Sequence, residues 1–196
     1  MRGGSGSHTR VKTTIPSNPS ENPVESAHGA LDQKPELSIV IPGLNEAESI
    51  PELAQGIHDT LGGNLAYEII FVDDGSTDDS WKVIEALHKE NAAVRGVRLR
   101  ANFGKAIALV AGFDKARGDI LMMMDADLQD DPREIPKFLE KIAEGEDLVV
   151  GWKVDRLDAQ NRLVLSKVFN TIVGAVTKVK LHDMNCGFKA FRREVL

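Results

Sequence analysis

From Leu37 onward, short apolar runs alternate along the chain with longer stretches of helical periodicity. The runs cover residues 37–41, 67–72, 94–99, 119–124 and 147–151. They are too short for helices, and most are too apolar for strands with one face in water, which is typical of parallel strands covered on both faces. The pattern therefore predicts five buried strands.

Between these runs, apolar residues recur at the spacing of helices that bury one face. The four stripes are Ile50, Leu53, Ala54, Ile57 and Leu61; Trp81, Ile84 and Leu87; Ile107, Val110 and Phe113; and Ile135, Phe138, Leu139 and Ile142. Gly118 and Gly145 lie where helix C-caps are expected, and Pro136 fits a helix only in its first turn. The alternation predicts an α/β fold, a doubly wound and mostly parallel sheet with helices on both faces and ligands at the carboxyl ends of its strands.

The first 35 residues differ from the rest of the 196-residue chain. They are rich in Ser, Pro, Asn and Gly and lack apolar periodicity, so residues 1–35 are predicted to be a disordered tail and residues 36–196 one domain. No apolar run approaches the roughly 18 residues that span a bilayer, and none near Met1 resembles a signal peptide. We expect a cytoplasmic protein in which Cys186, the single cysteine, is a small buried thiol.

Charge is distributed unevenly along the chain. Counting Lys and Arg against Asp and Glu, residues 1–36 are neutral, residues 37–150 carry −11 and residues 151–196 carry +5. A protein that binds nucleic acid would be basic overall or along one face, so this class is disfavoured. The distribution instead suggests a part that binds cations joined to a part that binds anions.

Polar motifs follow three of the predicted strands, at the points where the strands end. They are PGLNE (42–46), DDGSTDD (73–79) and DADLQDD (125–131). Each alone is explained by turn chemistry. Together they bring carboxylates to one edge, where these repel unless cations or protons compensate. A divalent metal is the simplest compensation, and Mg²⁺ or Mn²⁺ prefers such oxygen ligands. The carboxylates are those of Glu46, Asp73, Asp74, Asp125 and Asp127.

Other phosphate-binding classes fit the sequence poorly. No G-x-G-x-x-G opens a helix after the first strand and no G-x-x-x-x-G-K-[ST] occurs, which disfavours dinucleotide oxidoreductases and P-loop nucleotidases. A receiver-type phosphoacceptor site could be assembled from Asp73, Asp74, Asp125 and Lys189. It would leave PGLNE and DADLQDD without a role.

The motifs, taken in order, resemble a known family. SIVIPGLNEAESIPEL, EIIFVDDGSTDDS, NFGKAIALVAGFDKARGDILMMMDADLQDDP, LVVGWKVDR and LHDMNCGFKAFRREVL resemble successive blocks of glycosyltransferase family 2, which has the GT-A fold. The branch is that of the polyprenyl-phosphate, dolichyl-phosphate mannosyltransferase-like enzymes. The resemblance covers residues 37–196, and five blocks in the same order make it specific.

The resemblance implies roles for individual residues. The D-x-D of DADLQ would hold Mg²⁺ or Mn²⁺ on the diphosphate of a nucleotide sugar through Asp125 and Asp127, with Gln129 helping. Asp183 matches the acidic residue that the family places near the acceptor. The other residues expected to bind the nucleotide sugar are Pro42, Leu44, Asn45, Glu46, Asp73, Asp74 and Ala126. Lys105 follows the third predicted strand near the same edge, so it either contacts a phosphate of the donor or is a solvent-exposed residue at the start of a helix.

The implied reaction is inverting transfer of one sugar from a GDP- or UDP-linked donor to a polyprenyl phosphate. Residues 159–178 are apolar on more than one side and carry flanking basic residues, so they are either core or a helix at the membrane surface. We expect a peripheral protein at the inner face of the cell membrane that binds no nucleic acid. The basic residues suited to the acceptor phosphate or the sugar diphosphate are Lys153, Arg156, Arg162 and Lys167.

Two alternatives stay open at this point. The acceptor could be a glycan hydroxyl in the synthesis of a cell-envelope polysaccharide, or the chain could be a catalytically silent fragment that binds nucleotide sugars. Members of this branch usually continue past the equivalent of FRREVL, where a further helix is expected to begin. The domain is therefore expected to be truncated at its C-terminus.

Overall fold

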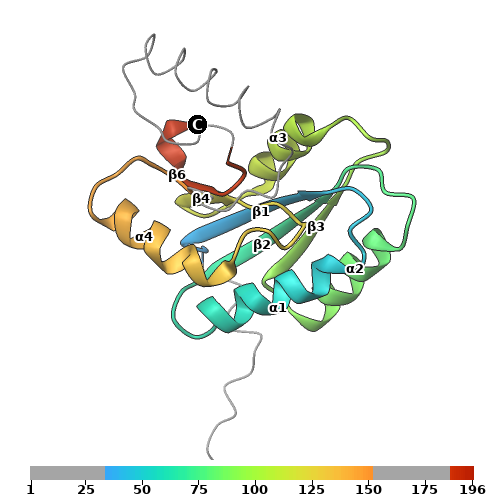
Figure 1. The fold of residues 1–196 in the computed structure, drawn as a ribbon, viewed down its shortest axis with the longest axis horizontal. Coiled ribbons are helices and arrows are strands. Elements are labelled where there is room, and N and C mark those ends of the chain that lie inside the picture. Colours follow the sequence, from blue (N-terminus) through green and yellow to red (C-terminus); the bar gives the residue numbers. More distant parts are fainter. Residues whose placement is uncertain (1–33, 152–185) are drawn as a thin grey trace, which may run out of the picture. The chain divides into compact units, whose positions relative to one another are not determined.

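The computed structural model describes residues 34–151 and 186–196, which form a six-stranded sheet with helices on both faces (Figure 1). The strands are β1 (Leu37–Gly43), β2 (Tyr67–Asp73), β3 (Val94–Arg98), β4 (Ile120–Met123), β5 (Leu148–Val150) and β6 (Lys189–Arg192). The helices are α1 (Ser49–Leu61), α2 (Ser80–Glu90), α3 (Lys105–Lys115) and α4 (Ile135–Ala143), with 3₁₀ turns η2 (Pro132–Glu134) and η3 (Arg193–Val195).

The order of the strands places β1 and β4 at the centre of the fold. The sheet runs β3-β2-β1-β4-β6-β5, and the β1–β2, β2–β3 and β1–β4 pairs are parallel. The chain builds outward from β1 to β3 and then returns to the other side of β1 with β4. The carboxyl ends of β1 and β4 therefore flank a topological switch point, which is where sheets of this kind bind ligands. The doubly wound, mostly parallel fold predicted from the sequence is confirmed.

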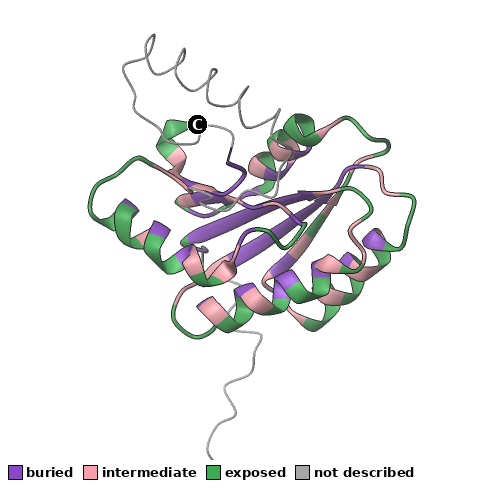
Figure 2. Cartoon of the chain, in the orientation of Figure 1, coloured by how far each residue is buried: buried purple, intermediate pink, exposed green. Residues whose placement is uncertain are grey.

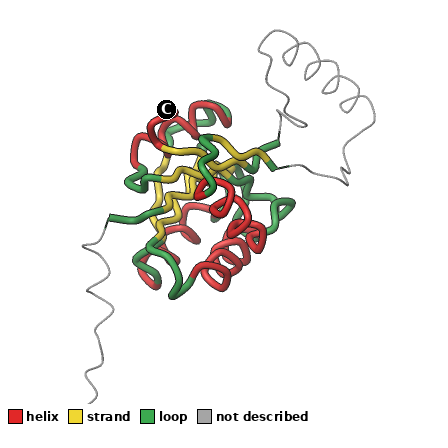
Figure 3. Tube along the Cα trace, turned by 90° about the vertical axis from the view of Figure 1, so that its left-hand side faces the viewer, coloured by secondary structure: helices red, strands yellow, loops and turns green. Residues whose placement is uncertain are grey.

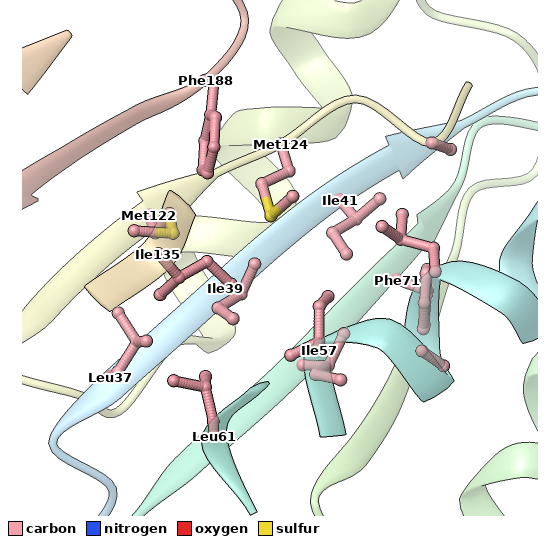
Figure 4. Close-up of a cluster of buried hydrophobic side chains, with 14 of the residues drawn as sticks. Leu37, Ile39, Ile41, Ile57, Leu61, Phe71, Met122, Met124, Ile135 and Phe188 are labelled. Carbon is pink, nitrogen blue, oxygen red and sulfur yellow. The ribbon is translucent and has the colours of Figure 1, made fainter. Parts of the chain in front are cut away.

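Both faces of the central strands are covered, which explains why these strands are apolar throughout. Leu37, Ile39 and Ile41 of β1 pack in one cluster with residues of α1, α2 and α4, while Val40 packs in a second cluster with α3 (Figures 1 and 4). The central strands β1 and β2 are buried and the outward faces of the helices are exposed (Figure 2), and the sheet lies between helices (Figure 3). The core therefore consists of two hydrophobic clusters, one on each face of the sheet.

Three of the four predicted helical stripes face the core. All five stripe residues of α1 are buried, and Ile135, Phe138 and Ile142 of α4 are buried as well. In α2, Ile84 is buried, whereas Trp81 and Leu87 are only partly buried against the core. Pro136 lies in the first turn of α4, as predicted.

The stripe predicted for α3 is wrong at Ile107 and Val110, whereas its third residue, Phe113, packs against the core. Ile107 and Val110 are 52% and 66% exposed, and the buried residues of this helix are Ala108 and Gly112. The reason is a close approach of the helix to the sheet, because a Cβ on Gly112 would lie 2.3 Å from Cγ1 of Val40. Small residues thus make the closest approach to the sheet, Leu109 and Phe113 pack against the same cluster, and Ile107 and Val110 are exposed.

The far side of the sheet also differs from the prediction. The sequence indicated five strands and a helix beginning near FRREVL, but this segment forms β6 followed by η3. Strand β6 pairs antiparallel with both β4 and β5. Its partners are distant in sequence, so no local pattern identifies it. The edge strands β3 and β5 are also more exposed than the predicted buried strands.

The two predicted glycine caps have different outcomes. Gly145 has a φ of +111° and follows the C-cap of α4, as a capping glycine does. Gly118 lies beyond Ala116, the C-cap of α3. It is required for another reason, because a Cβ there would lie 2.7 Å from the backbone N of Ser38.

The amino-terminal edge of the sheet holds a buried carboxylate, Glu68, at the start of β2. Its Oε1 accepts hydrogen bonds from Ser38 Oγ (2.7 Å) and Arg117 N (2.7 Å), and its Oε2 accepts from Arg95 Nη1 (2.6 Å) and Arg117 Nε (3.1 Å). Burial by itself would raise the pKa of Glu68, but the hydrogen bonds from Ser38 and Arg95 outweigh it and hold the pKa below its usual value of 4.5. The cluster joins β1, β2, β3 and the loop before β4.

Candidate functional site

The loops that follow β1, β2, β3 and β4 meet at the carboxyl-terminal edge of the sheet. Gly43, at the end of β1, lies beside Ala126 in the loop after β4, since a Cβ on Gly43 would be 3.5 Å from that of Ala126. Asp74 donates its backbone N–H to the carbonyl of Gly43 (2.9 Å). The structure thus brings PGLNE, DDGSTDD and DADLQDD together at the switch point.

Asn45 links the first two of these loops. Its backbone N–H donates to Ser76 Oγ (2.9 Å), and its Oδ1 accepts from the backbone N–H of Thr77 (2.8 Å). Asn45 has a φ of +59°, a left-handed conformation that Asn tolerates better than most residues. The next residue, Glu46, donates its N–H to Ser80 Oγ (2.8 Å) and accepts from Ser49 Oγ at Oε2 (2.7 Å). PGLNE is therefore held against the start of α2.

Asp73, the last residue of β2, has a carboxylate in which only one oxygen accepts a hydrogen bond. Its side chain is fully buried, and Oδ1 accepts the N–H of Ser76 (2.9 Å). Its Oδ2 has no hydrogen bond; its ion-pair partner is Arg98, whose Nε lies 3.5 Å away and whose guanidinium stacks over Trp81 at 5.5 Å. A buried acceptor without a hydrogen bond is costly, so this oxygen has the capacity to accept a donor from a ligand.

Asp74 is used differently, although it is the neighbour of Asp73. Its Oδ1 accepts the N–H of Phe103 (2.8 Å) and its Oδ2 accepts the N–H of Gly104 (2.9 Å). Gly104 has a φ of +91°, a conformation that favours glycine. The Asp74 carboxylate therefore fixes the loop that leads into α3 and positions Lys105, the first residue of that helix.

Strand β4 ends at Met123, so the acidic residues of DADLQDD lie in a loop rather than on the strand. Asp125 forms an ion pair with Lys105, and its backbone N–H donates to Oδ2 of the buried Asp130 (3.1 Å). Asp127 is exposed, and its Oδ1 accepts the N–H of Gln129 (3.1 Å). Between them and Asp130, Leu128 adopts a φ of +61°, which turns the chain away from extended geometry.

These residues fit a divalent cation that takes further ligands from elsewhere. Asp125, Asp127 and Gln129 offer carboxylate and amide oxygens, the donors that Mg²⁺ and Mn²⁺ prefer. Within residues 34–151 and 186–196, no group of three or more His, Cys, Asp or Glu side chains is placed to hold a metal by itself. The His, Cys, Asp and Glu side chains of these ranges would therefore supply only part of the ligands of such an ion.

Three residues at this edge were not singled out from the sequence. Arg98 pairs with Asp73, Asp130 accepts from the backbone of Asp125, and Gly187 packs against the Asp125 side chain, since a Cβ there would lie 2.4 Å from Asp125 Oδ2. Asp130 belongs to an acidic motif and could have been noted from its composition. Arg98 and Gly187 reach the site through folding alone, and no local signal identifies them.

Several predicted site residues lie outside the described residues. They are the candidate catalytic residue Asp183, the basic residues Lys153, Arg156, Arg162 and Lys167, the segment 159–178, and residues 1–33 of the predicted tail. Of the last two tail residues, Pro35 is buried and Lys34 pairs with Asp119. Cys186 is buried, as expected.

Fold and site together define a class, an α/β domain with an acidic binding edge at its switch point. The chain belongs to glycosyl transferase family 2, whose family model matches residues 38–196. The fold is the GT-A fold that the sequence resemblance implied.

Two curated relatives illustrate the branch. The undecaprenyl-phosphate 4-deoxy-4-formamido-L-arabinose transferase of Pseudomonas aeruginosa (strain LESB58) is 39% identical over 162 residues, which cover 82% of this chain and 48% of the relative. The dodecaprenyl-phosphate galacturonate synthase of Rhizobium johnstonii is 38% identical over 179 residues, covering 88% of this chain and 53% of the relative. The chain spans about half the length of the curated relatives it matches.

Solved structures agree on the fold. Glucosyl-3-phosphoglycerate synthase from Mycobacterium tuberculosis, in complex with UDP, superimposes with a TM-score of 0.65 at 26% identity, covering 85% of this chain and 60% of that one. Another structure of that enzyme, with Mn²⁺, UDP-glucose and phosphoglyceric acid, has a TM-score of 0.66 at 24% identity, with the same coverage.

Proposed function

We propose that this chain carries the donor-binding part of an inverting glycosyltransferase that moves one sugar from a GDP- or UDP-linked donor to a polyprenyl phosphate. The observation that carries the proposal is the gathering of Asp73, Asp125 and Asp127 at the β1–β4 switch point. Both curated relatives named above act on polyprenyl phosphates, which supports this acceptor class. Binding of UDP by the mycobacterial synthase supports a nucleotide-linked donor.

The donor has two separate sets of contacts at this edge. The Oδ2 of Asp73, which pairs with Arg98 but accepts no hydrogen bond, suits an N–H or O–H of the nucleoside, because a buried acceptor without a hydrogen bond is costly. Pro42, Leu44, Asn45, Glu46 and Ala126 border the same space in the family pattern. Asp125, Asp127 and Gln129 would hold Mg²⁺ or Mn²⁺, and the metal would supply positive charge to stabilise the diphosphate leaving group.

The acceptor side of the reaction involves residues outside the described ranges. The sequence resemblance assigns Asp183 to the acceptor, and Lys153, Arg156, Arg162 and Lys167 offer positive charge for a phosphate. The apolar residues of segment 159–178, which would cover more than one side of a helix, and its basic residues support contact with the inner face of the membrane rather than a place in the core. No helix in the parts of the chain that the structure describes has the length and apolarity needed to cross a bilayer.

A transfer assay with two acceptors tests the proposal. A phosphate monoester with a second pKa of about 6 is mostly anionic at neutral pH and can attack the sugar without losing a proton, whereas a hydroxyl needs a general base worth about 10²–10⁴ in rate. With a polyprenyl phosphate, Asp183→Asn should therefore keep measurable transfer of radiolabelled sugar. Asp59→Asn, an exposed carboxylate of α1, is the matched control and should behave as wild type.

The outcomes separate the acceptor classes. Transfer to the polyprenyl phosphate that survives in Asp183→Asn supports the proposal. Transfer only to a sugar hydroxyl, abolished in Asp183→Asn, contradicts it and favours a glycan acceptor. Binding of nucleotide sugars without transfer to either acceptor supports a silent binding module instead. A thermal-shift screen of GDP- and UDP-sugars with and without Mn²⁺ identifies the donor to use, because a ligand of the native state raises its melting temperature.

A further inference from the structure

Lys105 occupies an unusual place among the charged residues of the site. Its ammonium pairs with Oδ1 of Asp125, the first acidic residue of the D-x-D motif. The Asp125 side chain is only 26% exposed, and its other oxygen lies against Gly187. Both oxygens of Asp125 thus lie close to Gly187, and Oδ1 is in addition paired with a cation that belongs to the protein itself.

The position of Lys105 depends on the nucleoside side of the site. Lys105 directly follows Phe103 and Gly104, whose N–H groups are both held by the Asp74 carboxylate. Asp74 in turn follows Asp73, the residue with the free buried oxygen. A continuous set of contacts therefore runs from Asp73 through Asp74 and Lys105 to Asp125. This continuity places the ammonium of Lys105, on a half-exposed side chain, between the two parts of the donor site.

We infer that Lys105 is an exchangeable cation of the donor site: it neutralises Asp125 while the metal is absent and turns to the donor diphosphate when metal and nucleotide bind. The inference rests on the proposed function, because it requires a diphosphate at this edge. Asp125 cannot offer Oδ1 fully to a metal while the ammonium of Lys105 holds it. An incoming diphosphate gives that ammonium a new partner and releases the oxygen. Nucleotide binding thereby strengthens metal binding, and the reverse follows from linkage.

This role predicts effects of opposite sign on the two ligands. Without nucleotide, Lys105 competes with the metal, so Lys105→Met should lower the Kd for Mn²⁺ by about fivefold, the upper range for a partly exposed ion pair. With Mn²⁺ saturating, Lys105 binds the diphosphate, so the same variant should raise the Kd for UDP or GDP by about tenfold, as loss of a charged hydrogen bond does. A purely structural role would weaken both ligands or neither.

The first experiment measures Mn²⁺ alone, by the electron paramagnetic resonance signal of the free ion titrated with the full chain. Lys105→Arg keeps the charge and should stay near wild type. Lys115→Met removes a lysine of the same helix that pairs with Asp114, and it should change nothing. In an Asp125→Asn background, Lys105→Met should alter Mn²⁺ affinity by less than about twofold, because the paired carboxylate is gone. If Lys105→Met raised the Mn²⁺ affinity equally in the wild-type and Asp125→Asn backgrounds, Lys105 would act by long-range charge repulsion rather than through Asp125. That result would overturn the inference.

The second experiment measures UDP and GDP by calorimetry at saturating Mn²⁺ in the same variants. A weaker nucleotide in Lys105→Met, together with tighter Mn²⁺ in its absence, supports the inference. Changes of the same sign, or no change in either ligand, overturn it while the proposed function stands. If wild type binds neither nucleotide, the proposed function is contradicted, and the Mn²⁺ titrations still decide whether Lys105 competes for Asp125.

Discussion

The two edges of the sheet each bury a carboxylate but treat it in opposite ways. At the amino-terminal edge, both oxygens of Glu68 accept hydrogen bonds, and two arginines lie against them. At the carboxyl-terminal edge, Asp73 is just as buried, but its Oδ2 has no hydrogen bond and its arginine is at 3.5 Å. Both oxygens of Glu68 therefore accept hydrogen bonds from the protein, whereas one oxygen of Asp73 accepts none.

This difference separates a structural role from a binding role. A buried charge that the fold needs is surrounded by donors of the fold, because an unpaired buried charge is costly. A buried charge that binds a ligand must keep an acceptor without a hydrogen bond until the ligand supplies a donor. Asp74 shows that position in a motif does not decide the role, since both its oxygens hold backbone N–H groups of the loop before α3.

The largest expected effect is on stability at the amino-terminal edge. Glu68→Gln keeps the shape of the side chain but leaves Arg95 and Arg117 without their counter-charge. The free energy of unfolding should fall by about 3 kcal/mol, as for other broken buried ion pairs. Urea denaturation measures it. Glu85→Gln, on the exposed face of α2, is the control and should stay within about 0.5 kcal/mol of wild type.

The corresponding change at the carboxyl-terminal edge should affect binding instead. Asp73→Asn keeps the Oδ1 that accepts from Ser76, so the free energy of unfolding should change by less than about 1 kcal/mol. The affinity for UDP or GDP should fall by about tenfold, measured by calorimetry in Mn²⁺. Asp79→Asn removes an exposed carboxylate of the same motif and serves as the control. If Asp73→Asn lowered the free energy of unfolding as much as Glu68→Gln does, Asp73 would have a structural role like that of Glu68, which would contradict the binding role assigned to it.

A smaller effect is expected where backbone packing orients the metal site. Gly187→Ala places a methyl group within 2.4 Å of Asp125 Oδ2, so the carboxylate must move. Nucleotide affinity in Mn²⁺ should fall by about fivefold, and the change should disappear in an Asp125→Asn background, because the two residues act through one contact. Equal losses in both backgrounds would mean that Gly187 acts on the fold rather than on Asp125.

The smallest effect expected is a change of the Glu68 contribution with pH. The folded state holds the pKa of Glu68 below its usual value of 4.5, so this stabilisation is present above that pH and is lost as the pH falls through the folded pKa. The stability difference between wild type and Glu68→Gln should therefore shrink on acidification. Urea denaturation of both proteins at neutral pH and near about pH 3 checks this; a constant difference would contradict the assigned cause.

The sequence predicted the parts of this molecule that depend on local pattern. Strands β1 and β2 are apolar on both faces and were located from that alone. The meeting of PGLNE, DDGSTDD and DADLQDD followed from the rule that ligands bind at the carboxyl ends of parallel strands. Neither prediction required knowledge of a contact between distant residues.

What the sequence could not predict depends on long-range packing. The buried residues of α3 are Ala108 and Gly112 because the helix approaches the sheet closely there, and two of the three residues of the predicted stripe are exposed. Strand β6 is defined by pairing with β4 and β5 rather than by its own four residues. The pairing of Lys105 with Asp125 likewise joins a helix start to a loop after the next strand.

The carboxyl-terminal edge of the sheet should act as a metal-dependent site for a nucleoside diphosphate. Calorimetric titration of UDP and GDP into the chain, first with EDTA and then with Mn²⁺, measures this dependence. Two carboxylates and a diphosphate repel each other without a bridging cation, so binding should be restored by Mn²⁺, and Asp127→Asn should weaken it by at least about tenfold, or roughly 1.4 kcal/mol. Equal affinity in EDTA and Mn²⁺ would contradict this metal dependence.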